Sequence, residues 1–170
     1  MRLIRGRAWK FGDDINTDLI ISGKYKFKTL DMEELAKHAM EDLDPYFPRK
    51  VERGDLIVAG RNFGCGSSRE QAPQVLKSLG IAAVIAGSFA RIFFRNALSI
   101  GLPALECTSL HQHVETGTIL EVDLPGGVVR ELDGGRTYEA SPIPDFLLRI
   151  LEDGGVIEHF RKHGEFKWRG

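Results

Sequence analysis

The order of apolar and helical segments in the middle of the chain constrains its fold more than any other feature. Short apolar runs at residues 55–59, 81–86 and 102–107 alternate with two longer segments that end at Gly80 and Gly101. Strands joined by helical crossovers lie parallel in one sheet, and such crossovers are right-handed. The run at 81–86 is wholly apolar, as expected for a strand buried on both faces. The pattern therefore predicts a parallel sheet covered by helices.

Two residues indicate where the helices between these strands begin. Pro73 favours a helix that begins near it and reaches Leu79, because proline suits the first turn and disrupts the interior. Ser88 is expected to cap a second helix from Phe89 to Ile100. We expect the glycine that follows each helix to stop it.

The segments on either side of this centre predict antiparallel ribbons and further helices. A strand is expected at 5–11, and glycine pairs divide residues 118–140 into an antiparallel meander. Asp31 is expected to cap a helix that reaches Met40, and another helical region runs from Pro144 to Lys162. Residues 43–50, with two prolines, are expected to form a loop. The sequence thus predicts an α/β fold with a parallel-strand core and flanking antiparallel ribbons, formed by a single domain over residues 1–170.

The loop at residues 63–70 concentrates side chains that can bind a small acid. Gly64 and Gly66 permit backbone conformations closed to other residues and let a ligand approach the main chain. Backbone N–H groups that enter a helix attract anions, and Arg69 offers a planar fork suited to a carboxylate. Because the loop follows a strand of the predicted sheet, it lies at the edge where such sheets bind ligands. These features predict a site for a small carboxylic acid beside a serine.

Two other interpretations of the same loop have to be considered. Ser67 and Glu70 fit a capping box, in which both side chains only satisfy donors at a helix start. Pro73 argues against it, because a helix capped by Ser67 would place the proline in its interior. A nucleotide-binding unit is disfavoured because the loop lacks the third glycine and the acidic residue at the required distance.

Composition excludes several classes of function. The formal net charge of −1 predicts no general attraction to nucleic acid or to an anionic membrane. No apolar run approaches the roughly 20 residues of a membrane helix, and the first residues lack the apolar core of a signal peptide. We therefore expect a cytoplasmic protein.

Cysteines and histidines predict no cofactor bound by this chain. Cys65 and Cys107 are its two cysteines, whereas an iron–sulfur cubane needs three or four. Cys107 is expected in the core, and Cys65 has no histidine near it in sequence to act as its base. The five histidines show no metal-binding spacing with a carboxylate partner, so no metal site is predicted.

Three segments of the chain resemble a known family. They are Asn16-Thr17-Asp18, the loop from Gly64 to Glu70, and the block from Ser88 to Asn96. Together they resemble the small subunits of 3-isopropylmalate dehydratases and homoaconitases, and the swivelling C-terminal domain of aconitase. The likeness extends from about Ile4 to Lys162 in the family's order. The chain differs in having Gln71, where family members usually have histidine.

The resemblance implies an enzyme that isomerises a hydroxy acid by removing water and adding it back, as in leucine biosynthesis. It implies a single swivelling β/β/α domain and a large-subunit partner that carries a 4Fe-4S cluster, so that each subunit holds half of the active site. The substrate would be a small hydroxy-dicarboxylic acid. By position in the motifs, Ser67 would be the catalytic base. The substrate-binding residues implied in the same way are Ser68, Arg69, Asp18, Gly66 and Thr17.

The segment from Lys24 to Thr29 corresponds to a loop that varies within the family and shapes the pocket for the substrate's side group. It contains Tyr25, Lys26, Phe27 and Lys28. Phe27 suits an isopropyl group, whereas either lysine would suit a third carboxylate, as in the homoaconitase reaction. A bulky Phe27 also fits smaller acids of the methylmalate or dimethylmalate type. We expect isopropylmalate, with those acids as alternatives.

Two hypotheses lie outside this enzymatic reading of the motifs. A non-catalytic module could use the same glycine loop to bind an anion and regulate a partner.

Arg91 and Arg95, four residues apart on one predicted helix face, are expected to pair with acidic neighbours and to have a structural role.

Overall fold

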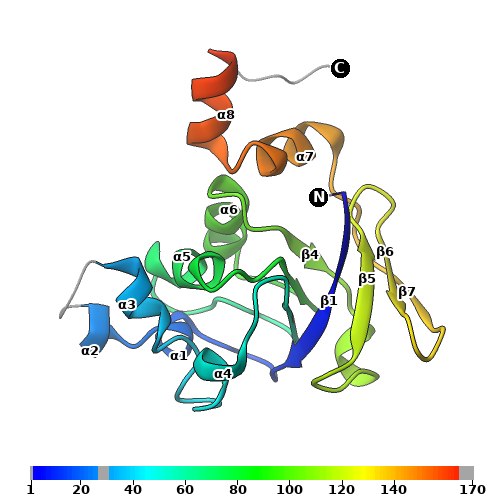
Figure 1. Ribbon diagram of the computed structural model, residues 1–170, viewed down its shortest axis with the longest axis horizontal. Coiled ribbons are helices and arrows are strands. Elements are labelled where there is room, and N and C mark those ends of the chain that lie inside the picture. Colours follow the sequence, from blue (N-terminus) through cyan, green and yellow to red (C-terminus); the bar gives the residue numbers. More distant parts are fainter. Residues whose placement is uncertain (1, 27–30, 165–170) are drawn as a thin grey trace.

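The computed structural model describes residues 2–26 and 31–164, and its centre is one seven-stranded sheet (Figure 1). The strand order is β4-β3-β2-β1-β5-β6-β7. The strands are β1 (Leu3–Lys10), β2 (Leu56–Ala59), β3 (Ala83–Ala86), β4 (Ala104–Glu106), β5 (Ile119–Asp123), β6 (Val128–Glu131) and β7 (Thr137–Glu139). The four strands from β1 to β4 run parallel, whereas β5, β6 and β7 continue the sheet antiparallel from the other edge of β1.

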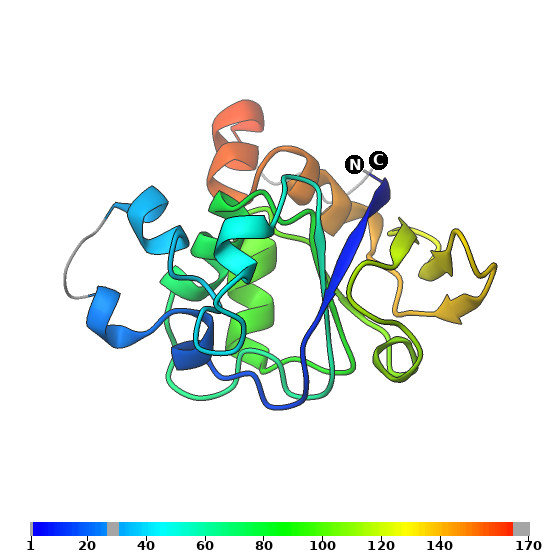
Figure 2. The ribbon, with the colours of Figure 1, turned by 60° about the horizontal axis from the view of Figure 1, so that its bottom comes forward.

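Helices cover the parallel half of the sheet. They are α1 (Thr17–Ile20), α2 (Gly23–Lys26), α3 (Met32–Ala36), α4 (Phe47–Lys50), α5 (Gln71–Ser78), α6 (Arg91–Ser99), α7 (Asp145–Glu152) and α8 (Val156–His163), with a 3₁₀ turn at Leu110–Gln112. In Figure 2 the helices lie on one side of β1 and the ribbon of β5, β6 and β7 lies on the other. Within the described residues, no helix has the length and apolar character that crossing a membrane requires.

Burial explains why the central strands read as continuous apolar runs. Every residue of β2 and β3 is buried, because each strand has a parallel neighbour on both edges and packed side chains on both faces. Each fully buried Val, Leu or Ile side chain contributes about 1.5–3 kcal/mol. The predicted α/β fold with a parallel core and antiparallel ribbons is therefore confirmed. That the whole chain forms one domain stays a prediction.

The predicted start of the helix near Pro73 is confirmed, whereas two other local predictions were wrong. Helix α5 begins at Gln71 and accommodates Pro73 in its first turn, where the backbone N–H has no helical partner anyway. Helix α6 begins at Arg91, and the Ser88 hydroxyl does not cap it but accepts a 2.8 Å hydrogen bond from the Asn62 backbone. Residues 47–50, expected in a loop, form α4 because Pro48 sits in the first turn, where proline is tolerated.

The helix near residue 31 begins as predicted but ends early. The Asp31 carboxylate accepts a 3.0 Å hydrogen bond from the Glu33 backbone, so the predicted cap is confirmed. Regular α-helix ends at Ala36, and turns continue to Met40.

Candidate functional site

The glycine loop lies at the carboxyl edge of the parallel strands, as predicted. Three segments meet there, and they follow β1, β2 and β3 in the chain. The Thr17 backbone donates to the Cys65 carbonyl (2.9 Å), and the Phe63 backbone donates to the Ser88 carbonyl (3.0 Å). These two bonds extend the sheet's parallel pairing beyond the strand ends and hold the loop between its neighbours.

Both glycines of the loop are required by its shape. Gly64 and Gly66 have φ of 82° and 89°, which side chains rarely adopt. A Cβ on Gly64 would lie 2.3 Å from the Phe93 ring, whereas one on Gly66 would meet nothing closer than Asn16, at 3.4 Å. Gly64 therefore serves close packing against α6, and Gly66 serves the turn itself.

The predicted substrate-binding residues Thr17, Asp18 and Arg69 come together at the loop. The buried Thr17 hydroxyl donates a 2.6 Å hydrogen bond to the carbonyl of Ser67. Arg69 Nη1 lies 3.1 Å from the carboxylate of Asp18 and donates to the Ile21 carbonyl. The Arg69 side chain is 20% exposed and that of Asp18 is 62% exposed. The guanidinium is therefore held against the protein while one face of the ion pair stays open to a second carboxylate.

The structure excludes the capping-box interpretation of the serine. Helix α5 starts after Glu70, and that residue's side chain makes no capping bond. Ser67 and Ser68 are both exposed, and the Ser67 hydroxyl has no hydrogen bond to any residue in the part of the chain that the structure describes. The oxygen is thus neither buried nor used by the local main chain, and it remains accessible to a ligand.

A cavity of about 220 Å³ opens beside the loop. Gly66, Ser68 and Arg69 form one wall, and Thr17 contributes from the start of α1. Ser67 and Asp18 lie next to this cavity in sequence but do not line it. Its walls therefore bring together four of the six residues that were predicted to bind or transform the acid.

Another part of the wall comes from α6 and contains polar residues for which no role in ligand binding was predicted. Arg91 and Asn96 line the cavity together with Phe93. The expected pairing of Arg91 and Arg95 with acidic neighbours is absent among the described residues. Arg91 belongs to the block from Ser88 to Asn96 that carries the family resemblance, although its helical spacing from Arg95 predicted a structural role.

The segment expected to set specificity starts next to Arg69. The backbone of Gly23, the first residue of α2, donates a 3.1 Å hydrogen bond to the Asp18 carboxylate. Tyr25 is half-buried and stacks on His38, with ring centroids 3.7 Å apart. Hydrogen bonding to Glu41 raises the pKa of the Tyr25 hydroxyl. Phe27, Lys28 and the side chain of Lys26 lie outside the described residues.

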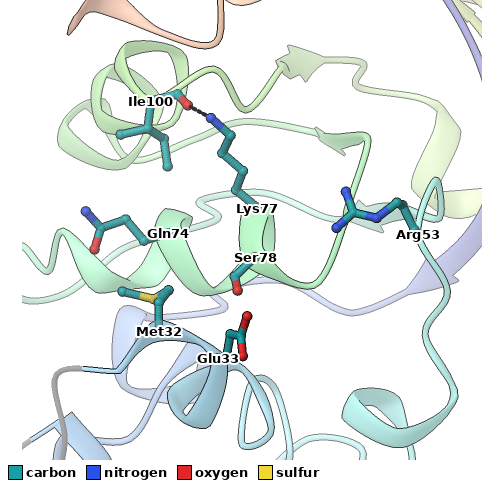
Figure 3. Close-up of a pocket in the computed structure, with 7 residues that line it drawn as sticks. All are labelled: Met32, Glu33, Arg53, Gln74, Lys77, Ser78 and Ile100. Carbon is teal, nitrogen blue, oxygen red and sulfur yellow. Dashed lines mark hydrogen bonds between the residues drawn. The ribbon is translucent and has the colours of Figure 1, made fainter. Parts of the chain in front are cut away.

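A second cavity, of about 590 Å³, lies between α3 and α5 (Figure 3). Of the described residues that line it, none belongs to the predicted site. The Lys77 ammonium donates to the carbonyls of Ile100 and Gly154, so its charge is already used to hold α5 against its neighbours. The glycine-loop cavity is therefore the better candidate site.

Cys107 lies in the core as predicted, and two histidines lie closer to a carboxylate than their spacing in the sequence indicated. Cys107 is 2% exposed, and burial raises the pKa of its thiol. Cys65 is partly exposed in the loop. His159 and His163, for which no metal-binding spacing was expected, lie together with Asp153 and their ligand atoms are within 4.8 Å of one another. The two histidines are four residues apart on α8, whereas Asp153 follows the end of α7, so only the turn between these helices brings the three together.

Comparison with known proteins gives matches to one family, over part of the chain for the family model and over nearly all of it for individual relatives. The family model described as aconitase C-terminal domain matches residues 14–110. The chain is 56% identical to 3-isopropylmalate dehydratase small subunit 1 of Methanopyrus kandleri, over 99% of this chain and 98% of the relative. It is 51% identical to the homoaconitase small subunit of Methanothermobacter thermautotrophicus, over 94% and 92%. A crystal structure of 3-isopropylmalate dehydratase from Methanocaldococcus jannaschii superposes with a TM-score of 0.88 at 45% identity, covering 95% of each chain.

Proposed function

Because the chain belongs to the aconitase C-terminal domain family, we propose that it is the small subunit of a hydro-lyase that interconverts 2-isopropylmalate and 3-isopropylmalate. The observation that carries this proposal is the open Ser67 hydroxyl beside an arginine-lined cavity, in a chain so similar to a dehydratase small subunit. The enzyme would serve leucine biosynthesis in the cytoplasm, as one domain that acts only together with a large subunit.

The reaction divides between the two subunits. Removing water from a hydroxy acid needs a Lewis acid for the departing hydroxyl and a base for the proton beside a carboxylate. The two cysteines cannot hold a 4Fe-4S cluster, since Cys107 lies in the core and three or four thiolates are needed. The Lewis acid would therefore come from a cluster on the large subunit, and this chain would contribute the base and the carboxylate site.

Ser67 is proposed as the base, acting as an alkoxide. A free serine hydroxyl is a poor base near neutral pH, so neighbouring donors would have to stabilise its anion in a closed cavity. The hydrogen bond from Thr17 to the Ser67 carbonyl fixes the backbone that carries this hydroxyl. Docking of the large subunit would close the cavity, and for this reason we expect the isolated chain to be inactive.

Substrate binding is proposed for the residues around Ser67. Ser68 and Arg69 would hold one carboxylate, with Gly66 leaving room for it to approach the backbone. Thr17 would line the same site while its hydroxyl holds the Ser67 carbonyl. Asp18 would orient the Arg69 guanidinium from the rim of the site. Tyr25, Lys26, Phe27 and Lys28 would contact the substrate's side group, because α2 begins against the Asp18 carboxylate.

The direct test is a Ser67→Ala variant mixed with a purified large subunit that carries its cluster. Loss of a general base lowers turnover by roughly 10²–10⁴-fold, while copurification of the two subunits should be unchanged. Ser141→Ala, at an exposed serine beyond β7, is the matched control and should keep full turnover. Turnover that survives in Ser67→Ala would contradict the proposed base. It would favour instead the non-catalytic module that binds an anion and regulates a partner.

Homoaconitase is the second candidate, because the Methanothermobacter thermautotrophicus relative with that name is 51% identical. Acids of the methylmalate or dimethylmalate type are further alternatives. The test is kcat/KM of the reconstituted complex on a panel of these acids. A value much higher for homoaconitate than for isopropylmalate would replace the proposed substrate without affecting the proposed chemistry.

A further inference from the structure

The turn between α7 and α8 gathers three potential metal ligands far from the glycine loop in sequence. Asp153 follows the last residue of α7, and Gly154 and Gly155 then adopt φ of 94° and 123°. These conformations reverse the chain, so that α8 packs next to α7 beside α6 (Figure 1). As a result, the Asp153 carboxylate points at one face of α8.

Two histidines on that face contact the same carboxylate oxygen. His159 Nδ1 lies 2.7 Å and His163 Nε2 lies 2.9 Å from Asp153 Oδ2. The histidines are four residues apart, which places them on one side of a helix. All three potential ligand atoms lie within 4.8 Å of one another, and the centroids of the two imidazole rings are 4.7 Å apart.

The surroundings of the cluster combine a buried wall with an open side. The His159 side chain is fully buried, that of Asp153 is 9% exposed and that of His163 is 28% exposed. A cavity of about 370 Å³ adjoins the latter two residues. The carboxylate therefore has one side against buried histidine and the other toward a cavity that water can enter.

We propose that Asp153, His159 and His163 bind one Zn²⁺ ion that fastens α8 to the end of α7. One carboxylate and two imidazoles form a donor set that zinc commonly takes, and water from the adjoining cavity would be the fourth ligand. Tetrahedral bonds of about 2.0–2.2 Å keep ligand atoms apart by more than a hydrogen bond does, so the three side chains would open slightly. The coordinating nitrogens would lose their protons to the other ring nitrogen or to solvent.

Lys162 is the main competitor for the carboxylate. Its ammonium lies 3.1 Å from Asp153 Oδ1, whereas both histidines use Oδ2. The Lys162 side chain is 67% exposed, so it can move into solvent without losing a buried contact. The ion pair therefore leaves one oxygen of the carboxylate for the metal.

The proposal can be tested on the full chain without its large subunit. After treatment with a chelator, the protein is titrated with Co²⁺, whose visible absorption reports a tetrahedral site, and the ion is then displaced with Zn²⁺. We expect one ion per chain and a higher melting temperature with Zn²⁺. His163→Gln should weaken Co²⁺ binding at least tenfold. His113→Gln, at an exposed histidine outside the cluster, should leave binding unchanged.

A second measurement covers the case in which the His163 variant fails to fold. In the unmodified chain, NMR resonances of the His159 and His163 rings should shift on addition of one equivalent of Zn²⁺, and those of His113 should not. The proposal is overturned if the chain shows no saturable binding up to millimolar Zn²⁺. It is equally overturned if His163→Gln folds and binds as tightly as the unmodified chain, or if other histidines respond instead.

Discussion

Replacing Gly64 with alanine tests the idea that the loop's shape depends on close packing against α6. The residue has φ of 82°, and a side chain in the left-handed region costs roughly 1–2 kcal/mol. The new methyl carbon would lie 2.3 Å from the Phe93 ring, whereas carbon atoms normally stay about 3.5–4.0 Å apart. One of the two segments must therefore move by more than an ångström.

The size of the effect follows from what Phe93 contacts. It is 3% exposed, and its ring packs edge-on against Phe63 at 5.1 Å. Overpacking such a core position costs about 1–3 kcal/mol, so strain and overpacking together predict a loss of about 2–5 kcal/mol. With a slope near 2 kcal/mol per molar urea, the midpoint of unfolding should fall by about 1–2.5 M.

Gly66→Ala is the matched control for Gly64→Ala. Gly66 has a similar φ of 89°, but its added methyl would make only an ordinary contact with Asn16 at 3.4 Å. It should therefore show the backbone strain alone, about 1–2 kcal/mol. Equal losses in the two variants, measured by urea unfolding at 25 °C, would refute the steric argument. A Gly64→Ala and Phe93→Ala double variant should in addition be less destabilised than the sum of the single changes.

Three other features of the structure give testable predictions. Arg91→Ala should raise KM for the acid by about 10–100-fold, since a charge-assisted hydrogen bond contributes about 1.5–3 kcal/mol. Arg95 lies outside the cavity wall, so Arg95→Ala should leave KM unchanged in the same kinetic assay. Asp55→Ala should lower the free energy of unfolding by about 2–4 kcal/mol, because the buried carboxylate accepts three hydrogen bonds whose donors would be left unpaired. A thiol reagent should label Cys65 rapidly and Cys107 only after unfolding. Burial raises the pKa of the Cys107 thiol. The contribution of this thiol to the free energy of unfolding is therefore complete below the ordinary thiol pKa and is lost as the pH rises through the raised pKa of the folded state. Denaturant titrations at several pH values from 7 to 10 should therefore show that the free energy of unfolding falls less with rising pH for Cys107→Ala than for the unmodified chain.

The sequence by itself determined the elements whose residues are buried or constrained locally. The apolar runs that become β2 and β3 could be recognised because strands buried on both faces leave no room for polar side chains. The loop at 63–70 could be placed at the carboxyl edge of the sheet because right-handed crossovers leave few alternatives. Asp31 was recognisable as a cap because its hydrogen bond reaches only two residues along the chain.

Only the tertiary structure decided which distant side chains meet. Ser88 had the right position for a cap, but its hydroxyl accepts a hydrogen bond from the backbone of Asn62 in a neighbouring loop. Thr17 reaches the Ser67 carbonyl, and Asp153 reaches two histidines on another helix, because loops and glycine turns bring these segments together. Local patterns record burial and backbone preference, whereas hydrogen bonds between segments depend on loop paths that no short stretch of sequence specifies.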